Sequence, residues 1–255
     1  MIDIHSHILP NIDDGARELS ESINIIKKAV SNGVTDIVVT PHFILGSSYS
    51  SKKSQNKKLL ATLKKELKDV PVNLYLGNEV FVDNDMVNML KKGVISTMND
   101  SRYVLFELPM NNEFNGIKNL IFDLKLNGYV PVIAHPERYR FIKKDPTKIL
   151  ELIEAGALFQ SNIGSVMGRY GKEAKKTLLL LLRHHAITFM GSDTHHSTDS
   201  FYDNKKECQK ILSKIIDSEY ITALFEGNAR KALNDEFIDI ETVIPFKTSV
   251  FHKYK

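Results

Sequence analysis

The chain alternates apolar segments typical of buried strands with segments typical of helices. The strand-like segments are 1–7, 36–42, 72–79, 103–109, 130–135, 158–162 and 186–190. The main helix-like segments are 20–31, 59–68, 117–127, 146–155, 174–182 and 205–234. Apolar side chains repeat at helical spacing in the first of these, which ends at Gly33. Strands that alternate with helices predict a parallel sheet with right-handed crossovers.

The predicted strands end in side chains of one chemical kind. Six of the seven lead into a His, Asp or Glu, and the remaining one ends in Asn162. In a closed α/β barrel the C-terminal strand ends meet at one mouth, whereas an open sheet spreads them along an edge. No glycine-rich phosphate loop follows the first strand, which counts against a nucleotide-binding open sheet. We therefore predict an α/β barrel of seven strands, with residues 1–255 forming a single domain.

Composition narrows the class of protein. A chain of 255 residues with 42% hydrophobic and 25% charged residues can build one large core. A net charge of +3 does not favour a nucleic-acid groove or an anionic membrane surface. The single cysteine, Cys208, excludes an intramolecular disulfide and fits a reducing compartment. No signal peptide or membrane-spanning apolar run is visible, so we expect a cytoplasmic protein without membrane insertion.

Two segments fall outside the strand and helix pattern. Residues 46–58 are rich in Ser, Lys and Asn, which predicts an exposed and mobile loop at the rim of any site. The basic tail 246–255 is predicted to be loosely held. Neither segment indicates an oligomeric state, and the prediction leaves an oligomer open.

The strand-end side chains predict a metal site. Asp3, His5 and His7 alternate along the first segment and project to one side of it, so two imidazoles can bind one ion. In the next loop, Asp13 or Asp14 either caps the following helix or supplies a carboxylate to the site. The ligand-type residues expected at the mouth are His5, His7, Asp14, His42, Glu79, Glu107, His135, Asp193 and His195. This set is too large for one ion and implies two or three divalent ions, for which nitrogen and oxygen donors suit Mn, Fe or Zn.

Together these motifs resemble the polymerase-and-histidinol-phosphatase (PHP) superfamily. The segments that carry the resemblance are DIHSH at 3–7, DDGA at 13–16, TPH at 40–42, ELP at 107–109, HPERY at 135–139, NIGS at 162–165 and SDTH at 192–195. Over about its whole length the chain is similar to the bacterial tyrosine-protein phosphatases of the capsular polysaccharide operons, the CpsB/YwqE group. The fold implied is a distorted seven-stranded α/β barrel, similar to a TIM barrel, that holds three metal ions.

The resemblance also implies roles for individual residues. One ion would be held by His5, His7, Glu79 and Asp193, a second by Asp14, His42 and His195, and a third by Glu107, His135 and the bridging Glu79. Arg138 would be the phosphate-binding and catalytic arginine, and Arg17 and Asn162 are further candidates for substrate binding. Two positions depart from the family pattern. The segment after His195 lacks the usual Asn and Arg, and Ala229 stands where Pro is common.

The predicted activity is that of a manganese-dependent protein-tyrosine phosphatase. A metal-activated hydroxide would attack phosphorus while the planar guanidinium of Arg138 stabilises the phosphoryl group. By resemblance, the substrate is a phosphotyrosine protein such as a bacterial tyrosine kinase that regulates capsular or exopolysaccharide synthesis. Cys208 is followed six residues later by Lys214, where a thiol-based tyrosine phosphatase needs Arg, so we predict a packing role for it.

Three other functions stay open at this point. The first is a small-molecule phosphatase of the histidinol-phosphatase type, and the second is a PHP-type exonuclease. A nuclease should carry basic residues interleaved with aromatic ones along a groove, and only the lysine-rich segment 52–58 approaches that pattern. The third is a metal-bound regulatory subunit without turnover.

Overall fold

The computed structural model describes residues 1–239 and 243–246 of the chain. Within these residues the strands are β1 (Ile2–Asp3), β2 (Asp36–Val39), β3 (His42–Phe43), β4 (Asn73–Leu76), β5 (Glu79–Phe81), β6 (Tyr103–Glu107), β7 (Val130–Ala134), β8 (Leu158–Asn162) and β9 (Phe189–Gly191). All of them pair in parallel, in a three-stranded sheet of order β1-β2-β4 and a six-stranded sheet of order β3-β5-β6-β7-β8-β9. The predicted parallel α/β architecture is confirmed. The predicted number of seven strands is wrong, because the described residues contain nine.

Helices connect these strands. The α-helices are α1 (Leu19–Ser31), α2 (Lys53–Glu66), α3 (Met86–Lys91), α4 (Ile117–Leu126), α5 (Arg140–Lys144), α6 (Lys148–Ala155), α7 (Ile163–Val166), α8 (Lys172–Arg183), α9 (Lys205–Leu212), α10 (Ser218–Thr222) and α11 (Asn228–Leu233). Short 3₁₀ turns cover Met98–Asp100 and Pro136–Arg138, and a π-helical turn, Ala223–Gly227, joins α10 to α11. None of the described helices combines the length and the apolar character that crossing a membrane requires.

The additional strands arise because two predicted strands are each divided in two. Segment 36–42 forms β2 and β3, and the division falls at Pro41, which has no N–H to donate to the ladder. In the neighbouring segment, Gly77 and Asn78 separate β4 from β5, and Asn78 Nδ2 donates to the carbonyl oxygen of Pro41 at 3.0 Å. After the division, β3 pairs with β5 in the larger sheet, which sets His42 directly opposite Glu79.

The prediction of an exposed loop over 46–58 is wrong for its second half. Helix α2 begins at Lys53, whose backbone N–H donates to the carbonyl oxygen of Val94 at 2.9 Å. One face of α2, with Asn56, Leu60 and Leu63, is buried. The composition of 46–58 does not indicate this face, because Asn56 is the only one of the three buried residues within that segment and it is polar. Contacts with the rest of the fold start the helix six residues before the predicted position.

Two further boundaries differ from the prediction. The last strand, predicted over 186–190, is formed by Phe189–Gly191. The helix predicted over 205–234 is interrupted after Leu212, and α10 starts after Asp217, whose side chain accepts from the backbone N–H of Tyr220 at 2.8 Å. Except for Phe246, the tail predicted over 246–255 lies outside the described residues.

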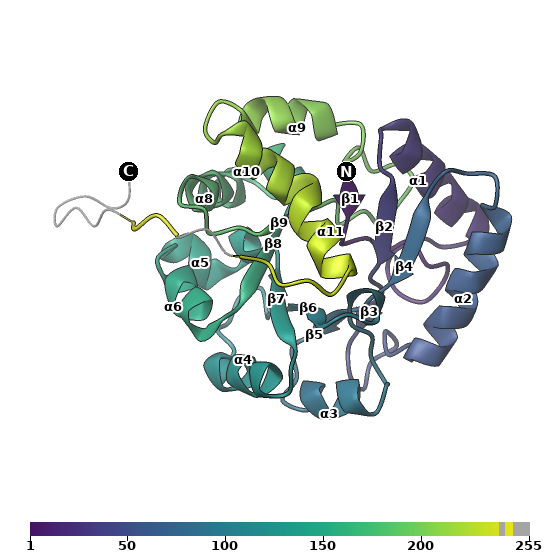
Figure 1. Cartoon of the computed structure of the whole chain (residues 1–255), viewed down its shortest axis with the longest axis horizontal. Helices are drawn as coiled ribbons and strands as arrows, with labels where there is room; N and C mark the ends of the chain where they lie inside the picture. The colour runs from purple at the N-terminus through teal and green to yellow at the C-terminus, as the bar shows by residue number, and fades with distance from the viewer. Residues whose placement is uncertain (240–242, 247–255) are drawn as a thin grey trace.

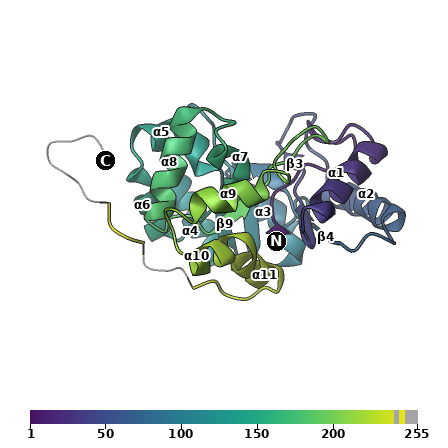
Figure 2. The ribbon, with the colours of Figure 1, turned by 90° about the horizontal axis from the view of Figure 1, so that it is seen from above.

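The buried apolar side chains of the described residues form three clusters. One packs β2 and β4 against α1 and α2, and another packs the six-stranded sheet against α3 to α10. The third is enclosed by strands of both sheets and includes side chains of α11. Figure 1 shows the strands in the centre with helices around them, and Figure 2 shows α1 and α2 on the opposite side from α5, α6 and α8. Because side chains alternate faces along a strand, neighbouring residues of one strand lie in different clusters. In β6, Leu105 lies in the third cluster, whereas Val104 and Phe106 lie in the cluster of the six-stranded sheet.

The segment that follows the first strand, β1, is hydrogen-bonded to the segment that follows the last strand, β9. Ser6 pairs in parallel with Thr194, and the backbone N–H of His7 donates to the carbonyl oxygen of Thr194 at 2.8 Å. The backbone N–H of Asp193 donates to the carbonyl oxygen of His5 at 2.9 Å. These bonds bring the residues that follow the first strand next to those that follow the last one.

Candidate metal centre and active site

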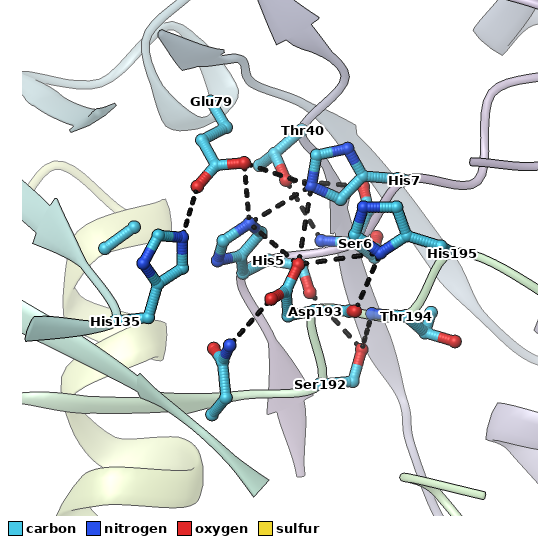
Figure 3. A network of polar contacts seen from close by, with 12 residues as sticks. His5, Ser6, His7, Thr40, Glu79, His135, Ser192, Asp193, Thr194 and His195 are labelled. Atoms are coloured by element: carbon cyan, nitrogen blue, oxygen red, sulfur yellow. Dashed lines mark hydrogen bonds and ion pairs between the residues drawn. The ribbon is translucent and has the colours of Figure 1, made fainter. Parts of the chain in front are cut away.

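The structure brings all nine predicted ligand-type side chains into one connected cluster at the C-terminal ends of the strands. Three groups have ligand atoms within 4.8 Å of one another: His7, Asp14, His42 and His195; His5, His7 and Asp193; and His42, Glu79 and Glu107. The ninth residue, His135, joins through its Nε2, which lies 2.9 Å from Glu79 Oε1. Figure 3 shows how the imidazoles and carboxylates at its centre point toward one another.

The innermost group has the spacing of a metal site. His5 Nε2 and His7 Nε2 lie 3.2 Å apart, and each lies 3.2 Å from Glu79 Oε2. Asp193 Oδ1 lies 3.5 Å from His5 Nε2 and 3.6 Å from His7 Nε2. Ligand atoms about 2.1 Å from a tetrahedral ion are about 3.4 Å apart. The four side chains therefore fit a divalent ion.

The outer ligand-type side chains continue this cluster in two directions. Asp14 Oδ1 lies 3.5 Å from both His42 Nε2 and His195 Nε2. On the other ring nitrogen, His42 Nδ1 lies 3.2 Å from Glu79 Oε2 and 3.5 Å from Glu107 Oε1. His135 Nδ1 is buried and has no hydrogen-bond partner among the described residues. Mixed imidazole and carboxylate donors of this kind suit Mn, Fe or Zn.

Further polar side chains lie behind the clustered imidazoles and carboxylates and orient them. Asp13 Oδ2 lies 3.0 Å from His7 Nδ1, and Gln160 Oε1 lies 2.7 Å from His5 Nδ1. Such partners fix the orientation of a ligating imidazole. Asn162 Nδ2 donates to Asp193 Oδ2 at 2.6 Å, and the Asn162 side chain is fully buried. The candidate substrate-binding Asn162 therefore lies behind a carboxylate of the cluster.

The structure shows which of Asp13 and Asp14 faces the cluster. Asp13 lies behind His7 and also accepts from the backbone N–H of His42 at 3.0 Å, whereas Asp14 faces the cluster. Gln160 was missed in the sequence, although it precedes Asn162 by two residues and so shares its face of β8.

The backbone around the cluster is unusual at three positions. His135 directly follows β7, Asp193 lies two residues beyond β9, and their φ angles are 34° and 53°. Left-handed conformations of non-glycine residues cost energy and concentrate at functional sites. At Gly15 a Cβ atom would lie 2.0 Å from the carbonyl oxygen of His7, so only glycine lets this loop approach the ligand strand.

Burial and crowded charge shift the pKa values of the cluster. Burial disfavours a charged His5, but the carboxylates of Glu79 and Asp193 raise its pKa to about 9. Burial and the charge of Glu79 raise the pKa of Glu107 to about 8, and burial and the charge of His7 lower the pKa of His42 to about 4. Buried acidic and basic side chains whose pKa values are shifted in opposite directions are typical of a functional site.

The cluster opens into a cavity of about 420 Å³. Its lining consists of Asp14, His42, Glu79, Glu107, His135, Arg138, Arg169, Tyr170, Asp193, His195, His196, Asp199 and Phe201. Arg138 NH1 donates to Asp193 Oδ2 at 3.1 Å, which places its guanidinium beside the cluster. Arg17 is exposed and does not line this cavity. Arg169, Tyr170 and Phe201 were not predicted from the sequence, because they lie in turns without a periodic pattern.

Cys208 lies away from this chemistry. It is buried in the apolar cluster between the larger sheet and its helices, and burial raises the pKa of its thiol to about 12. It does not line the cavity. A buried thiol with a raised pKa is a poor nucleophile.

A parallel α/β fold with clustered His, Asp and Glu side chains at the strand ends is typical of metal-dependent enzymes, among them hydrolases. The chain belongs to the family described as capsular polysaccharide synthesis, CpsB/CapC, whose model matches residues 1–234. It is 36% identical over 250 residues to the tyrosine-protein phosphatase YwqE of Bacillus subtilis, covering 97% of both chains. It is 32% identical over 245 residues to the tyrosine-protein phosphatase CpsB of Streptococcus pneumoniae, covering 93% of this chain and all of the relative.

A solved structure agrees with these relatives. It comes from a study of YwqE from Bacillus subtilis and CpsB from Streptococcus pneumoniae, described as metal-dependent tyrosine phosphatases. The match has a TM-score of 0.90 at 34% identity and covers 97% of this chain and 100% of the other. The predicted resemblance to this group is therefore confirmed.

Proposed function

We propose that the chain is a metal-dependent protein-tyrosine phosphatase that acts on a phosphotyrosine protein. The relatives named above support this substrate, and a bacterial tyrosine kinase of capsular or exopolysaccharide synthesis is the partner we infer. The observation that carries the proposal is the convergence of nine ligand-type side chains in one cluster, which opens into a cavity that Arg138 also lines. An intact set of this kind argues against a regulatory subunit without turnover.

The proposed ligand sets are those that the resemblance implies, and each shares at least two side chains with one group of the cluster. His5, His7, Glu79 and Asp193 would hold one ion, and Asp14, His42 and His195 a second, while Glu79, Glu107 and His135 would hold a third. We propose manganese as the ion. Divalent ions in such a site act as Lewis acids toward phosphoryl oxygens and generate a nucleophile from water at neutral pH.

The polypeptide contributes a cation of its own. The Arg138 guanidinium is planar and always charged, so it can bind two phosphoryl oxygens at once. Its contact with Asp193 orients it toward the ligand cluster. A tyrosine leaving group has a pKa of about 10, so its departure depends less on a general acid than that of serine does. Arg17 and Asn162 are assigned no contact with the phosphoryl group, since one is exposed outside the cavity and the other is buried behind Asp193.

The test is steady-state hydrolysis of a phosphotyrosine peptide with manganese and then with chelator. We expect metal-dependent turnover that falls about 10²- to 10³-fold in kcat/KM in Arg138→Ala, because one charge-stabilising group is lost. Arg183→Ala, at an exposed position at the end of α8, is the matched control and should keep full activity.

Other substrates distinguish the phosphotyrosine phosphatase from the alternative functions. A phosphoserine peptide, histidinol phosphate and single-stranded DNA are assayed under the same conditions. Turnover confined to histidinol phosphate or DNA would replace the proposed substrate and keep the metal centre. Absence of turnover of all these substrates with manganese bound would favour a regulatory subunit without catalytic activity.

We further propose that the two sheets form one distorted barrel, within a single domain of residues 1–255, and that the protein acts in the cytoplasm. The apolar cluster shared by both sheets and the hydrogen bonds between segments 5–7 and 193–194 support the barrel. Limited proteolysis that yields two separately folded fragments would contradict the single domain. Fractionation that finds the protein outside the cytoplasm would contradict the location.

A further inference from the structure

One wall of the cavity is aromatic and contains no metal ligand. It is formed by Tyr170, in the turn after α7, and by Phe201, in the loop that precedes α9. Both rings pack against Gly164 of α7, where a Cβ atom would lie 2.6 Å from Phe201 Cε1 and 3.1 Å from Tyr170 Cε2. Glycine at this position therefore makes room for the two rings.

An arginine lies over each ring. Arg138 Cζ is 4.5 Å from the centroid of Tyr170, and Arg169 Cζ is 5.5 Å from the centroid of Phe201. The Arg138 side chain is 27% exposed and contacts the cluster at Asp193, whereas the Arg169 side chain is 58% exposed. The two cations thus line the same cavity at different depths, with Arg138 at the ligand cluster and Arg169 toward the mouth.

The loop that carries Phe201 is held firmly. Asp199 Oδ2 accepts from the backbone N–H groups of His195 and His196, both at 2.9 Å. Lys28 of α1 donates to the carbonyl oxygens of Ser197 at 3.3 Å and Asp199 at 2.6 Å. Arg169 NH2 lies 3.4 Å from Asp199 Oδ1, so the same carboxylate fixes the loop and orients the arginine.

We propose that Arg169, with Tyr170 and Phe201, forms the subsite for the phenyl ring of phosphotyrosine. This inference rests on the proposed phosphatase function and names the residues that select an aromatic ester. A phosphoryl group at the ligand cluster and Arg138 leaves its ester substituent pointing toward the mouth. There a phenyl ring meets aromatic side chains, which pair with it edge to face or offset, and a guanidinium, which binds the face of a ring. An alkyl substituent gains neither contact.

The test measures binding of two phosphonates to the manganese-loaded protein by calorimetry. Benzylphosphonate carries the ring, and methylphosphonate lacks it. The wild type should bind benzylphosphonate more tightly. Arg169→Ala should reduce that preference about three- to fivefold, the factor expected for an exposed cation–π contact, and leave methylphosphonate binding unchanged. Arg169→Lys should retain part of the preference, and the control Arg183→Ala should retain all of it.

Kinetics provide the second readout. With a phosphotyrosine peptide, Arg169→Ala should raise KM by a similar factor and leave kcat unchanged, because the ring contact is the same before and during the reaction. Phe201→Leu keeps an apolar side chain but removes the ring, and it should reduce the benzyl preference as well. Each variant is compared with the wild type on one substrate, so the reactivity of the leaving group cancels.

Distinct outcomes overturn the inference and the proposed function. Equal loss of both phosphonates in Arg169→Ala would show that this arginine binds the phosphoryl group and not the ring. A wild type without benzyl preference, or an Arg169→Ala variant that keeps it, would also overturn the subsite even if phosphotyrosine is hydrolysed. If the wild type hydrolyses no phosphotyrosine and binds neither phosphonate, the proposed function fails and the subsite with it.

Discussion

Glu137 anchors the segment that carries Arg138, and its removal is the most informative perturbation. Its carboxylate is fully buried directly before Arg138. Oε1 accepts from the backbone N–H of Asn162 at 3.1 Å and from Ser165 Oγ at 2.6 Å. Oε2 accepts from Ser161 Oγ at 2.8 Å. These three bonds tie the turn 136–138 to β8 and α7.

The structure sets the size of the expected effect. Glu137→Ala leaves three buried donors without their acceptor, and each costs about 1 to 3 kcal/mol when unpaired. The two hydroxyl groups can rotate toward other acceptors, whereas the N–H of Asn162 cannot. We therefore expect a loss of about 3 to 5 kcal/mol in the free energy of unfolding. Glu137→Gln should lose only about 1 kcal/mol, because its amide can donate to Ser161 Oγ while its oxygen serves Asn162 and Ser165.

The assays are urea unfolding followed by circular dichroism and kcat/KM for a phosphotyrosine peptide. Displacement of the turn by about 1 Å should lower kcat/KM of Glu137→Ala about 10²-fold, since Arg138 and His135 lose their positions. Glu154→Ala, at an exposed position of α6, is the control and should change stability by less than about 0.5 kcal/mol. A Glu137→Ala protein as stable and as active as this control would refute the anchoring role.

Three further predictions concern the site loop, acid stability and the cysteine. Gly15→Ala must push its loop away from the His7 carbonyl, so manganese affinity measured by calorimetry should fall about tenfold or more, and an unchanged affinity contradicts this. Burial opposes the charge on Asp36, but the bonds of its carboxylate to Arg230 lower the pKa of Asp36 to about 2. The charged carboxylate therefore stabilises the fold above about pH 4, and this contribution of about 2 kcal/mol is lost as the pH falls toward 2. Urea unfolding across that range should show a smaller acid-induced loss in Asp36→Asn than in the wild type, and parallel curves would argue against it. Cys208→Ser should keep phosphotyrosine turnover, and thiol reagents should react with Cys208 only after unfolding in urea.

The sequence alone was sufficient to predict which ligand-type side chains cluster, because each of them is tied to a local pattern. His135 and Glu107 end or follow apolar segments typical of buried strands, and parallel strands place their C-terminal ends on the same side of the fold. The polar residues at these ends were therefore expected on that side of the fold. The same reasoning predicted the α/β class, and the motifs predicted the family.

Only the tertiary structure decided the arrangements that depend on contacts between distant segments. Local pattern could not tell Asp13 from Asp14, since both lie in one turn and only the position of His7 separates them. The division of the strands at Pro41 and the early start of α2 depend on partners far along the chain. The aromatic wall was invisible for the same reason, because Phe201 meets the turn after α7 only through folding. Periodicity records which face of an element is buried, whereas the identity of its neighbour is set by register and loop packing, which a single segment does not encode.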